Sequence, residues 1–349
     1  MVKLETRCVP VGALPYESIK HTTAMIAKLF KTTPFIPVLP NISPLDTIMY
    51  RTFENIPGIE FVDNKLSLKI GNQKYEKEIA ELDKCFKNPT IERLEKFSSD
   101  ALFLEKYFQM LTKFKSANSF INLIGPFTIS QLLLTAAQEQ VLADKSYRKL
   151  FIEAVCVKAL WAIEKTKQTN PNTVPIIVLE EPMLGQLGIV KHNNQDITSE
   201  LVTNMFAKVT EKLHHAGAIV CVQSMDKCDW SIPINAGVDI ISFNAYDNPN
   251  NLIIIPEILT TFLQKGGMIN WGIVPVVSEK MVKGLSLEYL DKRLTSTISG
   301  VVLSGVPADL LYNSALISVN GNTDHLPVLF AERAIMFATQ LSSRLPVRR

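Results

Sequence analysis

Short apolar runs rich in β-branched residues alternate with longer segments of helical periodicity, eight times along the chain. Runs such as PIIVL at 175–179 and VDIISF at 238–243 are apolar at almost every position, as is typical of parallel strands covered on both faces. Between such runs, Leu201, Met205 and Val209 recur every four residues, which indicates an amphipathic helix. Eight alternations predict a single (β/α)8 TIM barrel of the α/β class rather than an open sheet. The predicted strands are residues 9–13, 34–39, 119–124, 175–179, 219–223, 238–243, 268–274 and 315–319.

The whole chain, residues 1–349, is predicted to form one domain, because β/α barrels commonly reach this length. The stretch of about residues 40–118, between the second and third predicted strands, is longer than a barrel connection requires. It contains the segments IEFV and KLSLKI on either side of Asp63 and Asn64, which predicts a β-hairpin. We expect an insertion of a hairpin and helices over one mouth of the barrel; a small separate lobe is the alternative.

The charge distribution and the cysteine content limit which binding partners and which cellular compartment the sequence predicts. The 36 basic and 34 acidic residues are spread along the chain, without the basic stripe typical of nucleic-acid or membrane-surface binding. The five cysteines form no Cys-x-x-Cys pair, which suits a reducing compartment. No apolar run is long enough to cross a bilayer. We expect a soluble cytoplasmic protein that binds a small-molecule metabolite, with no nucleic-acid or membrane partner and with homodimer formation left open.

Polar and small residues collect just after the predicted strands, which is where β/α barrels place their chemistry. The same regions carry eight short motifs, in order along the chain: GALP at 12–15, PFIPVLP at 34–40, IPGI at 56–59, GPFT at 125–128, LEEP at 179–182, DW at 229–230, FNAY at 243–246 and WGIVP at 271–275. Together these motifs resemble those of the bacterial barrels grouped with cobalamin-independent methionine synthase and uroporphyrinogen decarboxylase. The resemblance covers about residues 9 to 325 and implies a barrel fold. For the methyl-transferring members it also implies a zinc ion that activates a substrate thiol.

The positions that the resemblance assigns to zinc ligands carry other residues here. It implies His-x-Cys or His-Cys-Cys after the fifth strand, an acidic ligand after the sixth and a cysteine after the eighth, where this chain has Gln223, Asn244 and Asn320. Zinc takes thiolate, imidazole or carboxylate ligands, and neutral amides are poor substitutes. Cys221 lies within a predicted strand, and Cys228 has no partner at ligand spacing. We therefore expect no zinc and no other cofactor, and we interpret the three amides as substrate-binding residues.

Glu180, the first of the adjacent pair Glu180 and Glu181, is a candidate catalytic residue. Strand alternation sends one carboxylate into the barrel mouth and the other toward the helices. The resemblance implies that the first of them, Glu180, holds the amino group of a substrate; a salt bridge to a Lys or Arg at the rim is the structural alternative.

Four further residues complete the candidate site. Asp226 follows the fifth strand and is a candidate general acid or base, although a simple turn explains it equally. Tyr246 offers a hydroxyl, Trp271 an aromatic wall beside a glycine, and Gly125 opens the GPFT loop, so all three are predicted to bind substrate. Trp230 fits a core position better than a binding position.

Three functions remain open. The first is a methionine synthase-like barrel without zinc that binds an amino-acid or one-carbon metabolite of the folate or pterin type, and that acts as a methyltransferase if it is an enzyme. The second is a non-catalytic metabolite-binding barrel, for which amides at the strand ends are better suited than acids and bases. The third is a cofactor-free lyase like uroporphyrinogen decarboxylase. A polycarboxylate needs several convergent cations, however, and the first strand end offers Arg7, with Arg51 further along the chain.

Overall fold

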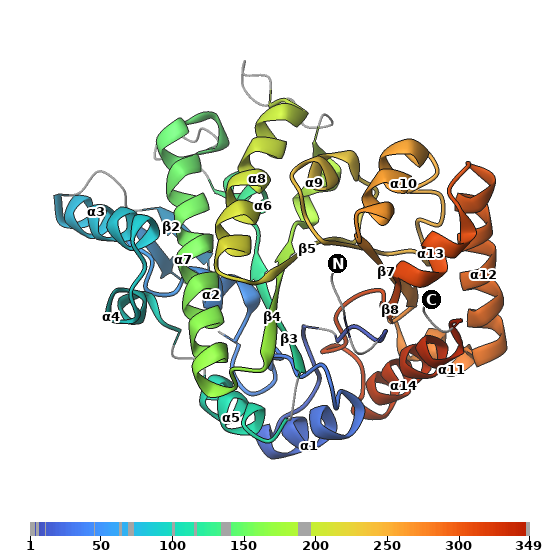
Figure 1. Cartoon of the computed structure of the whole chain (residues 1–349). Helices are drawn as coiled ribbons and strands as arrows, with labels where there is room; N and C mark the ends of the chain where they lie inside the picture. The colour runs from blue at the N-terminus through green and yellow to red at the C-terminus, as the bar shows by residue number, and fades with distance from the viewer. Residues whose placement is uncertain are drawn as a thin grey trace.

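A ring of parallel strands surrounded by helices forms the centre of the computed structural model (Figure 1). The structure describes residues 4, 7–10, 12–44, 46–62, 65–68, 73–99, 102–114, 117–133, 141–187 and 197–346. Six parallel strands pair in the order in which they occur along the chain. These are β3 (Ala117–Ile124), β4 (Thr173–Glu180), β5 (Ile219–Ser224), β6 (Ile240–Phe243), β7 (Met268–Val274) and β8 (Ala315–Val319). All six overlap the strands predicted from residue 119 onward.

Two N-terminal segments join the edges of this six-stranded half-barrel through isolated parallel bridges. The segment from Cys8 to Ala13 pairs with β8 at one end, and the segment from Phe35 to Val38 pairs with β3. The two segments also pair with each other, so the hydrogen-bonded ring is continuous around a TIM-barrel-like α/β fold. They coincide with the first two predicted strands. The bridges are Cys8 with Ile317, Ala13 with Val38 and Phe35 with Phe120.

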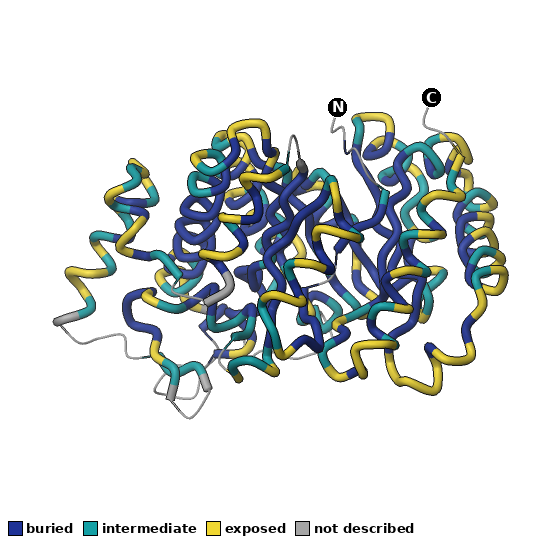
Figure 2. Tube along the Cα trace, turned by 90° about the horizontal axis from the view of Figure 1, so that it is seen from below, coloured by how far each residue is buried: buried dark blue, intermediate teal, exposed yellow. Residues whose placement is uncertain are grey.

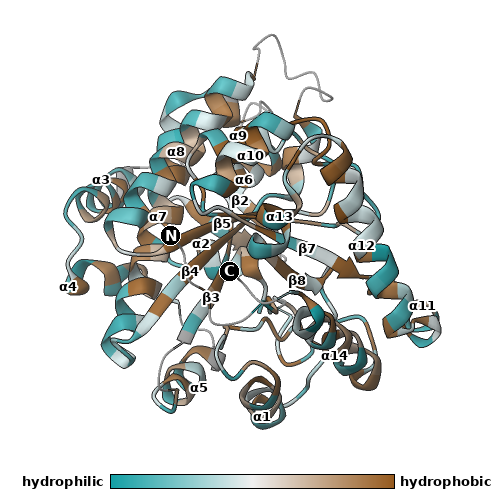
Figure 3. Ribbon diagram, turned by 45° about the vertical axis from the view of Figure 1, so that its right-hand side comes forward, coloured by the Kyte–Doolittle hydropathy of each residue, from teal (hydrophilic) through white to brown (hydrophobic). Residues whose placement is uncertain are grey.

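Helices connect the strands along the outside of the ring, and the strands between them are buried and apolar (Figures 2 and 3). The helix α8 (Ser199–His215) buries the stripe that contains Met205 and Val209, as its periodicity predicts. Thr198 caps its N-terminus by accepting a hydrogen bond from the Leu201 amide. The other helices of the outer layer are α1 (Ile19–Leu29), α5 (Leu102–Leu111), α7 (Lys145–Thr169), α9 (Ser231–Asn235), α10 (Pro256–Gln264), α12 (Leu287–Leu303) and α14 (Val328–Arg344).

The insertion between the second and third strand segments lies partly at the mouth and partly on the flank. Its hairpin, β1 (Ile59–Val62) and β2 (Lys65–Leu68), is antiparallel as predicted, whereas the turn residues 63 and 64 lie outside the described part of the chain. Helix α2 (Ile48–Phe53) packs against β3, while α3 (Gln73–Lys87) and α4 (Ile91–Leu94) pack on the outer side of α7 (Figure 1). Because α7 is covered on both sides, its residues 150–163 are all buried.

Short helices fill the remaining connections. Helix α6 (Pro126–Leu132) follows β3, and α11 (Glu279–Gly284) and α13 (Ala308–Ser314) flank α12. Three 3-10 turns lie at Glu95–Phe97, Val141–Ala143 and Pro182–Gln186. Among the described helices, none is both long and apolar enough to cross a bilayer.

Candidate functional site in the barrel interior

One polar side chain from each of the six parallel strands faces the inside of the ring. We call this set the inner belt: Asn122, Glu180, Gln223, Ser242, Asn270 and Ser318. The orientation of Asn122 and Glu180 follows from Gly12 in the first strand segment, where an added Cβ would lie 3.5 Å from each of these two side chains. Asn122, Glu180 and Gln223 are only partly buried, so solvent or a ligand can reach this side of the belt.

Hydrogen bonds order the far half of the inner belt. Asn270 Nδ2 donates to Ser242 Oγ at 2.8 Å and to Ser318 Oγ at 2.9 Å. Ser242 Oγ in turn donates to Gln223 Oε1 at 3.2 Å. Asn270 is buried, and its Oδ1 has no hydrogen-bond partner among the described residues. A buried amide oxygen without a partner is unfavourable unless a water or a ligand group donates to it.

Among the described residues, the Glu180 carboxylate has one hydrogen-bond partner, Asn122, whose Nδ2 donates to Oε1 at 2.7 Å. Burial raises the pKa of Glu180 from its ordinary 4.5 to about 7, and the bond from Asn122 opposes this only in part. No lysine or arginine in the described part of the chain forms an ion pair with Glu180. The salt bridge that was the alternative to a binding role is therefore not found in the part of the chain that the structure describes.

Glu181 faces the opposite way, as strand alternation predicts, and has a structural role. Its two carboxylate oxygens accept hydrogen bonds from the amides of Phe127 at 3.1 Å and Thr128 at 2.6 Å, in the first turn of α6. Burial raises the pKa of Glu181 to about 7 despite these bonds. A Cβ at Gly125 would lie 2.0 Å from Glu181 Oε1, so Gly125 provides the space for this carboxylate. The LEEP motif is thus hydrogen-bonded to the GPFT motif within the fold.

Asn244 and Asn320, two of the three amides predicted to bind substrate, meet at the ends of β6 and β8. Asn320 Nδ2 donates to Asn244 Oδ1 and to Asp247 Oδ2, both at 3.2 Å, and Asn244 Nδ2 donates to the same Asp247 oxygen at 2.7 Å. Gln223 is not in this group, since its described partner is Ser242. Asp247 was not among the predicted residues; its only signal was an Asn three residues earlier, the spacing at which the Asp247 amide donates back to Asn244 Oδ1.

Trp271 does not lie on the inner belt. Its neighbour Asn270 faces inward, so Trp271 faces the helix layer, where it is fully buried. The ring centroids of Trp271 and Phe243 are 5.3 Å apart, and those of Phe243 and Trp230 are 6.1 Å apart. Trp230 is buried as expected, and both tryptophans belong to this aromatic layer of the core.

Tyr246 and Asp226 lie outside the inner belt. The hydroxyl of Tyr246 is 3.1 Å from that of Tyr289, a hydrogen bond that, with partial burial, raises the pKa of Tyr246 to about 12. Arg293 donates to the Tyr246 carbonyl at 2.7 Å and lies 5.4 Å over its ring. Asp226 is exposed in the loop after β5, close to Gly185.

The cysteines near the strand ends are buried thiols. Burial raises the pKa of Cys221 far above its ordinary value and that of Cys228 to about 12, so neither is a thiolate near neutral pH. In the described ranges, no three His, Cys, Asp or Glu side chains lie close enough to form a metal site.

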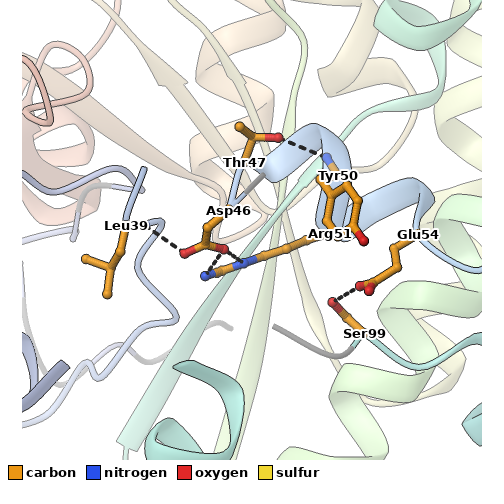
Figure 4. Close-up of polar contacts among 7 residues, drawn as sticks. All are labelled: Leu39, Asp46, Thr47, Tyr50, Arg51, Glu54 and Ser99. Carbon is orange, nitrogen blue, oxygen red and sulfur yellow. Dashed lines mark hydrogen bonds and ion pairs between the residues drawn. The ribbon is translucent and has the colours of Figure 1, made fainter. Parts of the chain in front are cut away.

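An ion pair between the buried Arg51 and the partly buried Asp46, which the sequence did not predict, fixes the insertion beside the belt. Figure 4 shows the Arg51 guanidinium against Asp46, with Nε to Oδ1 and Nη2 to Oδ1 both 2.6 Å. The other oxygen of Asp46 accepts from the Leu39 amide at 2.9 Å, and Thr47 caps α2. This pair holds α2 at the end of β3, where the Ile124 amide donates to Thr52 Oγ1 at 3.0 Å.

No protein-family model and no curated protein matches this chain. Among solved structures, the chain is similar to the catalytic domain of the GH26 endo-β-1,4-mannanase of Bacillus sp. JAMB-750. The TM-score is 0.42 and the sequence identity 11%, over 74% of this chain and 71% of that domain. The fold assignment therefore depends on the strand order and the closing bridges of this chain itself.

Proposed function

We propose that the inner belt binds a small metabolite that carries a protonated amino group, and that Glu180 holds this group. The observation that supports this most is the Glu180 carboxylate, which is partly buried, accepts one hydrogen bond and has no cationic partner in the described structure. An ammonium group would supply a charge-assisted hydrogen bond and would favour the ionised carboxylate. An amino-acid or one-carbon metabolite of the folate or pterin type fits this proposal and the motif resemblance.

The remaining belt residues suit the neutral polar parts of such a ligand. The Gln223 amide can both donate and accept hydrogen bonds without a net charge. Asn270 Oδ1, which has no partner among the described residues, can accept one. Polar groups placed to match a ligand in this way provide selectivity, because an analogue lacking the matching group leaves them unpaired.

Methyl transfer is the catalytic form of this proposal, and non-catalytic binding is the second candidate. Methyl transfer to a thiol requires that the thiol of the ligand lose its proton. Cys221 and Cys228 do not assist this step, because burial keeps both of them protonated near neutral pH. The mutual hydrogen bonds of Asn244, Asn320 and Asp247 favour binding without turnover, because they occupy the groups at this end of the barrel. The decarboxylase alternative has less support, since Arg51 is already paired with Asp46.

A calorimetric titration with homocysteine, methionine and reduced folates, repeated with the variant Glu180→Gln, tests the proposal. We expect an amine-bearing ligand to bind the wild type and to bind Glu180→Gln at least about tenfold more weakly, since a hydrogen bond to a charged group contributes about 1.5–3 kcal/mol. Glu279→Gln, at an exposed glutamate on α11, should bind as the wild type does. Equal affinity for Glu180→Gln, or for a ligand whose amine has been acetylated, would contradict the proposal.

The same titrations separate turnover from binding. Incubation of homocysteine with 5-methyltetrahydrofolate should yield methionine if the barrel is a methyltransferase, and binding without product supports the non-catalytic form. Metal analysis of the purified chain should find far less than stoichiometric zinc. Stoichiometric zinc that is lost together with activity on chelation would overturn the interpretation that Gln223, Asn244 and Asn320 leave the barrel without a zinc site.

A further inference from the structure

A long groove lies on the outer surface of the barrel, away from the inner belt. It has a volume of about 1070 Å³ and runs between α7 and α8, with the end of α3 at one side. Its lining on α8 extends from Thr198 to His215, roughly 25 Å at ~1.5 Å per residue. The groove is therefore elongated along the helices.

The floor of this groove is apolar. Phe86 from α3, Ile152 from α7, and Leu201 and Met205 from α8 form it. Phe86 and Leu201 are only partly buried, so part of the floor is in contact with water. An apolar surface of this kind, rimmed by polar residues, is typical of an interaction site.

The rim of the groove is predominantly basic. The lining carries five Lys or Arg residues and three Glu residues, and one of the five, Lys149, is ion-paired with Asp83 at 2.7 Å. Glu153 lies buried in the groove wall, and burial raises its pKa to about 7, so at neutral pH it contributes less than a full negative charge. Lys145 and Lys208 are exposed, and neither forms an ion pair with a described carboxylate.

We propose that this groove binds an acidic amphipathic helix of a partner protein. An apolar stripe at positions i, i+3, i+4 and i+7 would pack on the floor, and Asp or Glu side chains beside the stripe would lie near Lys145 and Lys208. At one end of the groove the Lys212 ammonium lies 4.7 Å from the centroid of the Phe86 ring, so a cation is available to the same partner there as well. The length of the groove and the sign of its rim both match such a helix.

A fluorescently labelled synthetic peptide provides the probe: about 18 residues long, with Leu in the amphipathic stripe and Glu at the other positions. Anisotropy titration against the full chain should show saturable binding that weakens with salt. A peptide of identical composition with the stripe scrambled should bind at least about tenfold more weakly, because it cannot place its Leu side chains on one face.

Variants of the chain locate the binding. The double variant Lys145→Glu and Lys208→Glu, and separately Leu201→Glu, should each weaken the peptide at least about fivefold, whereas Lys113→Glu, at an exposed site away from the groove, should not. Circular dichroism and melting temperature confirm that each variant is folded. The proposal is overturned if the wild type does not bind the peptide, if the scrambled or an all-Lys peptide binds equally well, or if Lys113→Glu has the same effect. Concentration-dependent self-association lost in Leu201→Glu would instead assign the groove to a second copy of this chain.

Discussion

The adjacent carboxylates of Glu180 and Glu181 have similar raised pKa values but opposite roles. Glu181 is fully enclosed and is bound to two backbone amides of α6, so it completes the structure of the chain itself. Glu180 remains partly accessible and accepts one hydrogen bond, so it has the capacity to bind something else. The difference arises entirely from the alternation of side chains along β4.

Gly125 is the residue whose substitution should disturb this arrangement most specifically. In Gly125→Ala the new Cβ would overlap the Glu181 side chain, which cannot move without losing its amide partners. We expect a loss of unfolding free energy of about 2 kcal/mol, measured by urea denaturation, as is usual for overpacking. Unchanged stability would show that Glu181 has another position available.

Gly300→Ala is the control for Gly125→Ala, because it adds the same methyl group where there is space for it. It lies within α12, and no atom is found within 4 Å of the position that its Cβ would take. Gly300→Ala should leave the free energy of unfolding unchanged or raise it by about 0.5–1 kcal/mol, because alanine loses less backbone entropy in a helix. The same urea titration checks this, and a marked destabilisation would contradict the described packing of α12.

At the scale of single residues, the alternation of side chains predicted the two faces of β4 correctly. The same alternation along β7 indicates that Trp271 faces the helices if Asn270 faces the inside of the ring. The contacts of Gly125 and Asp247 could not be predicted in the same way, because each depends on a partner from another strand end. Asp46 and Arg51 are close in sequence, but nothing in their spacing indicates that Arg51 is buried against a partly buried Asp46.

Helix α2 depends on the ion pair between Asp46 and Arg51. In Asp46→Asn the Arg51 guanidinium would remain buried without its counter-charge, which should lower the free energy of unfolding by about 3 kcal/mol or more in chemical denaturation. The exposed pair of Asp291 and Arg344 is the control, and Asp291→Asn should change stability by less than about 1 kcal/mol. Equal effects of the two variants would contradict the burial of Arg51.

The elements from β3 onward follow the hydrophobic pattern closely, whereas the first two strand segments form only isolated bridges. Proline explains much of the difference, since it has no amide hydrogen to donate to a ladder. Pro10 lies within the first segment, and Pro34 and Pro37 lie at and within the second. The pattern therefore predicted where these segments run, but not how few hydrogen bonds they form.

At the scale of the whole molecule, three of the described carboxyl groups make the stability depend on pH. Burial raises the pKa values of Glu153, Glu180 and Glu181 from 4.5 to about 7. Between these values the folded chain binds more protons than the unfolded chain, so the contribution of these groups to stability is present in full below about pH 4.5 and is lost as pH rises to about 7.

Urea denaturation midpoints measured between about pH 4.5 and 7 should show the contribution of these three carboxyl groups to stability. Glu153→Gln removes one of the three groups and should flatten the pH dependence between about pH 5 and 7, since each pKa unit corresponds to about 1.4 kcal/mol. Glu279→Gln, at an exposed site, should leave the slope unchanged. The expectation fails if Glu153→Gln has the same pH profile as the wild type.

The isolated bridges between the N-terminal segments also determine where the barrel should open most readily. Local opening takes place where the fewest hydrogen bonds hold a segment. The amides of Val9, Ile36 and Val38, each bonded across a bridge, should therefore exchange with deuterium faster than those in the middle of β4, which pairs on both sides. Since a Cβ at Gly12 would lie 3.5 Å from Glu180 Oε1, such opening would give small molecules a sideways approach to the inner belt between the strand segments.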